Sequence, residues 1–165
     1  MTAYEYIQDF YRDQTARRSG VPLIRHIDEG LEILEILNAS NITKDAYAIH
    51  PIVQSFCESS YPSIIDMDSY ALACEYRYFA NRFLCCTEND HIKTTEQLSK
   101  FLHNGMYGQM SMECTQMLIA DKMQNRKDFL IYHKGKHSRS EQLEGYFNLW
   151  LDFLIPYYGK QEPRY

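Results

Sequence analysis

Apolar residues recur along this chain at steps of three and four, the spacing of α-helices that bury one face. Residues 3–18 follow this spacing, and residues 27–37 repeat it with isoleucine and leucine. The same pattern predicts further helices over residues 44–49, 69–86, 95–102, 110–130 and 140–154. We find no segment that alternates between apolar and polar residues as a half-buried strand does. The pattern therefore predicts an all-α protein, a bundle of six or seven helices.

Turn-forming and capping residues set the expected ends of these helices. Gly20 and Pro22 break the first helix, and Thr43 is expected to cap the third. Pro51 follows the third helix closely, and inside a helix it would remove a hydrogen bond and clash with the carbonyl of Tyr47. Either the helix kinks at Pro51, or it ends there and a new turn begins with Pro51 near its first position.

Composition narrows the class of protein. The chain has 165 residues, 45% of them hydrophobic, which suits one globular domain over residues 1–165 without a linker. The formal net charge of −5 disfavours binding to nucleic-acid polymers and to anionic membranes. We see no signal-peptide pattern at the start and no apolar run near the ~18 residues of a membrane span. An odd count of five cysteines indicates reduced thiols, so we expect a cytoplasmic protein.

Three segments carry recognisable motifs. Residues 17–26 read Arg-Arg-Ser-Gly-Val-Pro-Leu-Ile-Arg-His, residues 46–51 read Ala-Tyr-Ala-Ile-His-Pro, and residues 118–125 read Leu-Ile-Ala-Asp-Lys-Met-Gln-Asn. In this order they resemble the motifs of the HD-type hydrolase domain of Rel/SpoT-type alarmone (ppGpp) hydrolases and their small stand-alone relatives. His26 and His50 are 24 positions apart (50 − 26), which matches the family spacing. The resemblance spans about residues 1–155.

The resemblance implies an HD-type helical fold and a role for each matching residue. His26, His50 and Asp121 would bind a divalent metal, usually manganese (Mn²⁺), whose bound water attacks a phosphorus atom. Asn125, four positions after Asp121 on the same helix face, would contact the ribose of a nucleotide. The alternatives are a histidine at the edge of the core for His26, and a cap or surface helix pair for Asp121 and Asn125.

The chain departs from the family pattern at the catalytic acids. Pro51 stands where the family has a metal-binding aspartate, and Gln54 and Ser55 stand where it has a glutamate–aspartate pair. Neither side chain replaces a carboxylate as a base near neutral pH, so catalysis should fall by roughly 10²–10⁴-fold. Two histidines and one carboxylate can still hold a metal, at lower affinity. A displaced acid is an alternative, with Glu58, Asp66 and Asp68 as the candidates.

Cationic residues near these motifs are candidates for binding the nucleotide. Arg17 matches the family residue that stacks on the purine, and Arg18 is an equally basic neighbour. Residues 132–139 form a basic loop in an acidic protein, and glycine beside lysine and arginine can wrap a phosphate. The candidates in this loop are Lys134, Lys136 and Arg139. The alternative is that these are ordinary solvated charges.

Three functions fit these features. The chain also resembles small proteins of large tailed phages, and the resemblance favours a binding protein with a degenerate catalytic site. Such a protein would sequester a nucleotide second messenger, an alarmone or a cyclic nucleotide of antiviral immunity, in the host cytoplasm, and homo-oligomers would suit that role. The second function is a metal-dependent nucleotide pyrophosphohydrolase or phosphodiesterase that uses Mn²⁺. The third is a protein-interaction module that keeps only the fold.

Overall fold

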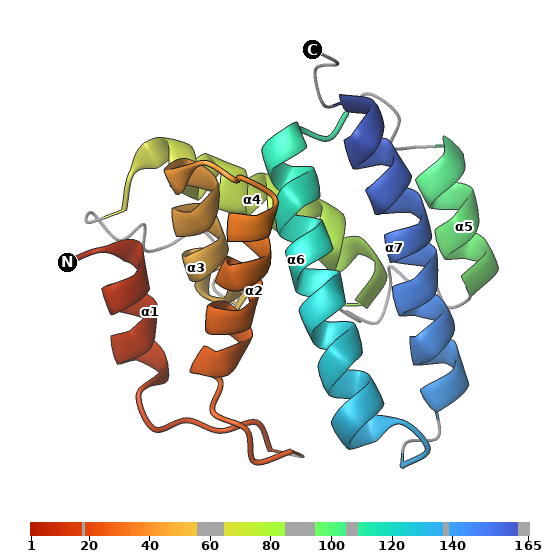
Figure 1. Ribbon diagram of the computed structural model, residues 1–165, viewed down its shortest axis with the longest axis horizontal. Coiled ribbons are helices and arrows are strands. Elements are labelled where there is room, and N and C mark those ends of the chain that lie inside the picture. The colour runs from red at the N-terminus through yellow and green to blue at the C-terminus, as the bar shows by residue number, and fades with distance from the viewer. Residues whose placement is uncertain (18, 56–64, 85–94, 105–108, 137–138, 162–165) are drawn as a thin grey trace.

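The computed structural model describes residues 1–17, 19–55, 65–84, 95–104, 109–136 and 139–161. Within these ranges the chain forms seven α-helices and no β-strand (Figure 1), which confirms the all-α prediction. The helices are α1 (Ala3–Tyr11), α2 (Ile24–Ile36), α3 (Asn41–Ser55), α4 (Met67–Leu84), α5 (Thr95–Asn104), α6 (Met112–Asp128) and α7 (Ser140–Gln161), with one turn of π-helix, η1 (Phe129–His133).

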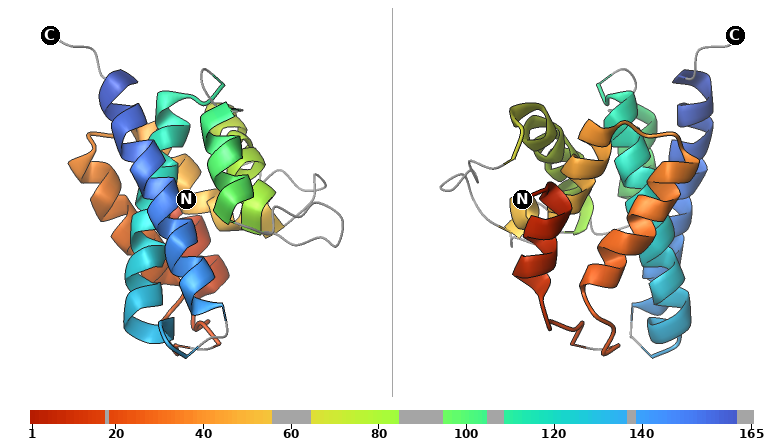
Figure 2. Two further views of the ribbon diagram at one scale, coloured as in Figure 1. Left: turned by 90° about the vertical axis from the view of Figure 1, so that its right-hand side faces the viewer. Right: turned by 60° about the vertical axis from the view of Figure 1, so that its left-hand side comes forward.

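Helix α6 lies at the centre of the bundle. It runs between α2 and α7 in Figure 1 and also packs against α3 and α4. Its side chains are buried without interruption from Cys114 to Lys122. A helix that is covered on several sides has no broad solvent face, so it lacks the polar stripe of a surface helix. Helix α3 packs on α1, α2 and α4, and α5 packs on α7 (Figure 2). Helices α2, α3 and α6 therefore all pack against one another.

The first helix is shorter than predicted. It ends before Arg12, which takes a positive φ of 34°, and not near residue 18. The loop that follows is closed by an antiparallel bridge between Thr15 and Pro22. Gly20, with a φ of 71°, provides the left-handed turn that this reversal requires. The bridged loop delivers the chain to the start of α2, where His26 lies in the first turn.

The third helix is longer than predicted at both ends. It continues through Pro51 to Ser55, so the prediction of a helix over residues 44–49 alone is wrong. Ser40 takes the capping role predicted for Thr43, because its hydroxyl oxygen accepts a hydrogen bond from the Thr43 backbone N–H at 3.1 Å. Much of the helix is buried against its neighbours, and this packing offsets the hydrogen bond that the proline cannot make.

Smaller corrections apply to the later helices. Helix α4 begins two residues early, and the Asp66 carboxylate accepts the backbone N–H of Ser69 at 3.1 Å in its first turn. The helix predicted over residues 110–130 changes to π-helical geometry after Asp128. Ser140 does begin the last helix, but its hydroxyl oxygen accepts the backbone N–H of Gly135 at 3.1 Å instead of capping α7.

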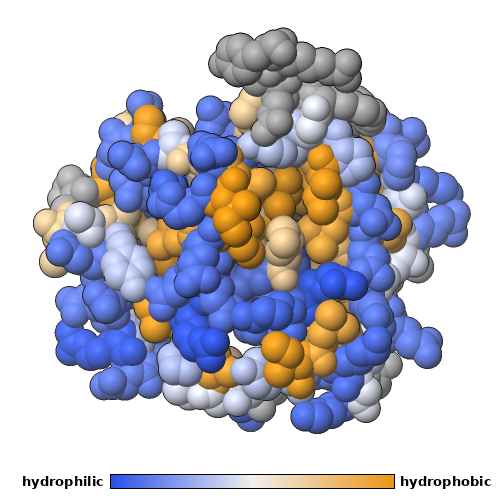
Figure 3. Space-filling model, in the orientation of Figure 1, coloured by the Kyte–Doolittle hydropathy of each residue, from blue (hydrophilic) through white to orange (hydrophobic). Residues whose placement is uncertain are grey.

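The polar positions of the helical pattern lie mostly on the surface. On the face shown in Figure 3, hydrophilic residues surround a group of apolar ones near the centre. Among the described residues, Ile36 at the end of α2 is the most exposed of the large apolar side chains, at 78%. No helix within the described ranges combines the length and the apolar content that crossing a membrane requires.

Candidate metal centre

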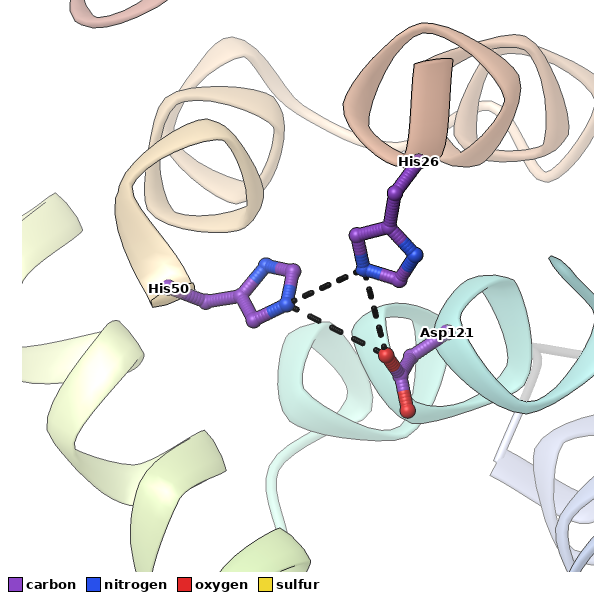
Figure 4. A group of neighbouring side chains, drawn as sticks. All are labelled: His26, His50 and Asp121. Atoms are coloured by element: carbon purple, nitrogen blue, oxygen red, sulfur yellow. Dashed lines mark hydrogen bonds and ion pairs between the residues drawn. The ribbon is translucent and has the colours of Figure 1, made fainter. Parts of the chain in front are cut away.

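Three side chains from three different helices converge at the centre of the bundle. His26 comes from α2, His50 from α3 and Asp121 from α6 (Figure 4). The His26 Nε2 atom lies 3.3 Å from His50 Nε2 and 3.5 Å from Asp121 Oδ1. His50 Nε2 lies 3.9 Å from the same carboxylate oxygen. The structure therefore brings together the three residues that the sequence motifs indicated as metal ligands.

The hydrogen bond at its other ring nitrogen determines which way His50 presents its lone pair. His50 Nδ1 lies 2.6 Å from the backbone carbonyl oxygen of Tyr47. A carbonyl oxygen only accepts, so Nδ1 carries the hydrogen and the lone pair is on Nε2. Burial, reinforced by the charge of His26, lowers the pKa of His50 to about 3, so the ring is neutral at neutral pH.

Pro51 leaves the Tyr47 carbonyl without its usual backbone donor. In a regular helix the carbonyl of Tyr47 would accept the backbone N–H of the residue four positions later, and that residue is Pro51. Proline has no N–H. The Tyr47 carbonyl oxygen therefore accepts from the His50 ring without a backbone N–H of position 51 beside it.

His26 is oriented in the same sense by a side chain of α6. Its Nδ1 atom lies 2.5 Å from the side-chain oxygen of Gln124. An amide oxygen only accepts, so Nδ1 carries a hydrogen, and the tautomer with Nδ1–H has its lone pair on Nε2. Both Nε2 atoms then present lone pairs across 3.3 Å and cannot hydrogen-bond to each other. A cation between them would satisfy both.

Asp121 supplies the negative charge of the centre. Its Oδ2 atom accepts a hydrogen bond from Lys122 Nζ at 2.8 Å, and its Oδ1 atom accepts one from Asn125 Nδ2 at 2.8 Å. Burial would raise the pKa of Asp121, but the charge of Lys122 and then those of the two histidines outweigh it and lower the pKa to about 2. The side chain is therefore a carboxylate at neutral pH.

Lys122 is itself buried, with 2% of its surface exposed. Its ammonium group pairs with Asp121 and lies 5.6 Å from the ring centres of both Tyr146 and Trp150. Burial disfavours the charged form, but Asp121 outweighs it and raises the pKa of Lys122. The aromatic faces and the carboxylate together keep a buried cation beside the centre.

These donors fit a divalent transition metal. Two imidazole nitrogens and one carboxylate oxygen form a ligand set that such ions use, and both nitrogens present lone pairs toward one point. The hydrogen bonds that orient the two rings are of the kind that accompanies metal-binding histidines. A bound divalent ion would supply charge for a phosphate and would lower the pKa of a bound water.

The centre lines a pocket of about 460 Å³. Pro51 and Gln54 line the same pocket as the three residues above. Apolar and aromatic side chains form much of the wall, and they include Tyr11, Leu23, Phe129, Leu143 and Phe147. This size and mixture of walls are typical of small-molecule sites.

Some of the predicted nucleotide-binding residues line the pocket, and others do not. Asn125 lines the pocket, as do the ligand candidates. Arg17 is exposed and is not among the lining residues. Arg18 lies outside the described residues. Of the basic segment, His133 lines the pocket, whereas the side chains of three other residues lie outside its lining: Lys134, Lys136 and Arg139.

Two of these three cationic side chains, Lys134 and Arg139, interact with nearby side chains of α7. Lys134 Nζ lies 2.7 Å from a carboxylate oxygen of Glu144, and Arg139 Nε donates to the Gln142 side chain at 2.7 Å. Lys136 is exposed. Lys134 and Arg139 therefore contact side chains at the start of α7.

The two described candidates for a displaced acid, Asp66 and Asp68, are not at the centre. Asp66 caps α4, and neither Asp66 nor Asp68 lines the pocket. Glu58 lies outside the described residues. The pocket does contain a carboxylate that the motifs did not indicate, Asp128, which accepts a hydrogen bond from Gln124 Nε2 at 2.8 Å.

No family model, curated protein or solved structure matches this chain. The site therefore rests on its own geometry. Sequence reasoning missed Gln124 and Asp128, although a signal was present. They lie three and seven positions after Asp121 in one helix, a spacing that places all three on one face.

Proposed function

We propose that this protein binds a small nucleotide in the pocket, holds its phosphate through a divalent metal at the candidate centre, and releases it unchanged. The observation that carries the proposal is the convergence of two imidazole lone pairs and one carboxylate in the lining of a pocket of about 460 Å³. A site of this size admits a mononucleotide or a compact cyclic nucleotide.

Charge in the pocket supports a metal-dependent mode of binding. No lysine or arginine is among the described residues that line it, and Asp121 and Asp128 both contribute carboxylates. A phosphate entering such a pocket alone would be repelled. A divalent ion on the three ligands supplies the missing positive charge, so ligand binding should depend on the metal.

The other surfaces of the pocket suit the rest of a nucleotide. Asn125 donates its amide hydrogen to Asp121, and none of the described residues donates to its side-chain oxygen, which can therefore accept a hydrogen bond from a sugar hydroxyl. The aromatic rings of Tyr11, Phe129 and Phe147 offer apolar faces to a base. The resemblance to alarmone hydrolases favours an alarmone or a cyclic nucleotide as the ligand.

Release without cleavage follows from the residues beside the metal ligands. Pro51 and Gln54 line the pocket where the family pattern has carboxylates, and neither can take a proton from water near neutral pH. Asp128 is two helical turns from Asp121, about 10.5 Å along the axis by helix geometry, and it already accepts from Gln124. Capture needs no base, so the loss of these acids is compatible with a protein that sequesters its ligand.

The test is incubation of purified protein with ppGpp and a panel of cyclic nucleotides, with Mn²⁺ or with chelator. Protein and solution are separated, the protein is heated, and both fractions are analysed by chromatography. We expect one nucleotide to leave the solution only with Mn²⁺ and to return intact after heating. Asp121→Asn should abolish this depletion. His103→Ala, which removes an exposed histidine of α5, is the matched control and should retain it.

Hydrolysis is the second candidate, favoured by the intact set of His26, His50 and Asp121. A product that appears with Mn²⁺, and not with chelator or with Asp121→Asn, would replace capture by hydrolysis. If wild-type protein depletes no nucleotide under any condition and binds no metal, the proposal is wrong, and a protein-interaction role for the fold becomes the next hypothesis.

A further inference from the structure

We infer that Gln124 is a positioning residue, which holds His26 in the one tautomer that can bind a metal. The inference rests on the proposed function, because it assigns a role toward the same centre. Gln124 has 2% of its surface exposed and lies on α6, one turn after Asp121.

The amide orientation of Gln124 follows from its neighbours. Gln124 Nε2 lies 2.8 Å from Asp128 Oδ2 and 3.3 Å from Glu29 Oε2. Ionised carboxylates only accept hydrogen bonds, so the NH₂ group must face them. The opposite end of the amide, the oxygen, then faces His26 Nδ1 at 2.5 Å. A reversed amide would place its oxygen against two carboxylates and would lose both hydrogen bonds that its NH₂ group donates to them.

Glu29 is fixed in turn by two cations. Arg25 Nη2 donates to its Oε1 atom at 2.9 Å, and Lys127 Nζ pairs with its Oε2 atom. Glu29 lies one turn after His26 on α2, so the network joins α2 to α6 around the ring that it orients. His26 is thus held from its own helix and from the helix of Asp121.

The consequence is specific to the tautomer. With the Gln124 oxygen in place, the His26 ring hydrogen is on Nδ1 and the Nε2 lone pair faces His50 and Asp121. Without it, the ring can place its hydrogen on Nε2 and donate to Asp121 Oδ1, which lies 3.5 Å away. That tautomer satisfies the carboxylate and blocks the metal.

The first measurement is NMR of the ring nitrogens in metal-free protein, which distinguishes Nδ1–H from Nε2–H directly. Wild-type His26 should be the Nδ1–H tautomer, and Gln124→Met, which keeps the length of the side chain and removes its polar atoms, should shift it toward Nε2–H. Gln116→Met is the matched control. Gln116 is also buried on α6 and donates to the Leu37 carbonyl at 3.0 Å, away from the centre.

The second measurement is Mn²⁺ and Co²⁺ affinity by calorimetry, with far-UV circular dichroism to verify folding. Gln124→Met should bind about 10–100-fold more weakly than wild type, the usual effect of removing a group that orients a metal ligand, while Gln116→Met should bind as wild type does. An unchanged tautomer or an unchanged affinity in folded Gln124→Met would overturn the inference. A shifted tautomer in a protein whose wild type binds no metal would overturn the proposed function and leave the positioning role standing.

Discussion

Gly30 of α2 lies against the side chain of Tyr47 of α3, and alanine there is our most quantitative prediction. A Cβ atom on Gly30 would lie 2.0 Å from the Tyr47 hydroxyl oxygen and 2.2 and 2.3 Å from two of its ring carbons. Carbon atoms pack at about 3.5–4.0 Å. The ring must therefore move by more than an ångström.

Tyr47 has no room for that movement. It is fully buried, its ring centre lies 4.7 Å from that of His50, and it stacks on His26 at 6.0 Å. Overpacking of a close-packed interior costs about 3 kcal/mol at the upper end of its usual range. Replacing glycine by alanine inside a helix recovers about 1 kcal/mol. Gly30→Ala should therefore lower the free energy of unfolding by about 2 kcal/mol.

The assay is urea unfolding followed by circular dichroism, on a double-mutant cycle with Tyr47. In a Tyr47→Ala background the obstruction is gone, so Gly30→Ala should stabilise by about 1 kcal/mol, which gives a coupling of about 3 kcal/mol between the two sites. Tyr47→Phe should not rescue Gly30→Ala, because the ring carbons remain within 2.3 Å of the new atom. Wild-type stability in Gly30→Ala, or full rescue by Tyr47→Phe, would refute this account.

Three further changes test other parts of the structure. Lys122→Met leaves the buried carboxylate of Asp121 without its cation and should lower the free energy of unfolding in urea by about 3–5 kcal/mol. Lys127 is half-exposed, so Lys127→Met should lower it by less than about 1 kcal/mol. Equal losses in the two variants would contradict the burial argument. Pro51→Ala restores a helical N–H and should stabilise by about 2 kcal/mol, the helix gain of about 3 less the roughly 1 that proline contributes through the unfolded chain; a lower unfolding midpoint would count against it. Burial opposes ionisation of Glu29, but hydrogen bonds, led by the one from Lys127, outweigh it and lower the pKa of Glu29. The stabilisation from this carboxylate is therefore present above the usual glutamate pKa and is lost as the pH falls below it. Glu29→Gln should make the free energy of unfolding depend less on pH between pH 6 and 3, and an unchanged slope would exclude the effect.

Much of the helical pattern was predictable from local sequence. The spacing of apolar residues in α2 and α5 led to helices close to those observed, because an amphipathic helix carries its own buried stripe. Helix α7 begins where predicted but continues to Gln161, past the predicted end at residue 154. The predicted helix ends were wrong where tertiary packing outweighed local sequence preferences. α3 continues through Pro51 because its flanking residues are buried against other helices, and α1 stops early because the bridge between Thr15 and Pro22 redirects the chain.

The candidate site, too, was predictable from the sequence only in part. His26, His50 and Asp121 were predictable because motif spacing is a property of the sequence. The exposed position of Arg17 was not, and neither was the ion pair that holds Lys134 at the start of α7. Side-chain direction in loops depends on the neighbours that the fold provides.

The sequence by itself determined that this protein is helical, where most of its helices lie and which three residues are candidates for binding a metal. Only the tertiary structure decided how those residues are used. Gln124 meets His26 across 98 positions of the chain and Glu29 across 95, and no periodicity encodes such contacts. The tautomers of two histidines, the burial of Lys122 and the absence of cations from the described pocket lining all depend on which helix faces which. Helix formation depends on neighbours three and four residues apart, whereas a binding site depends on groups that only packing brings within hydrogen-bond distance.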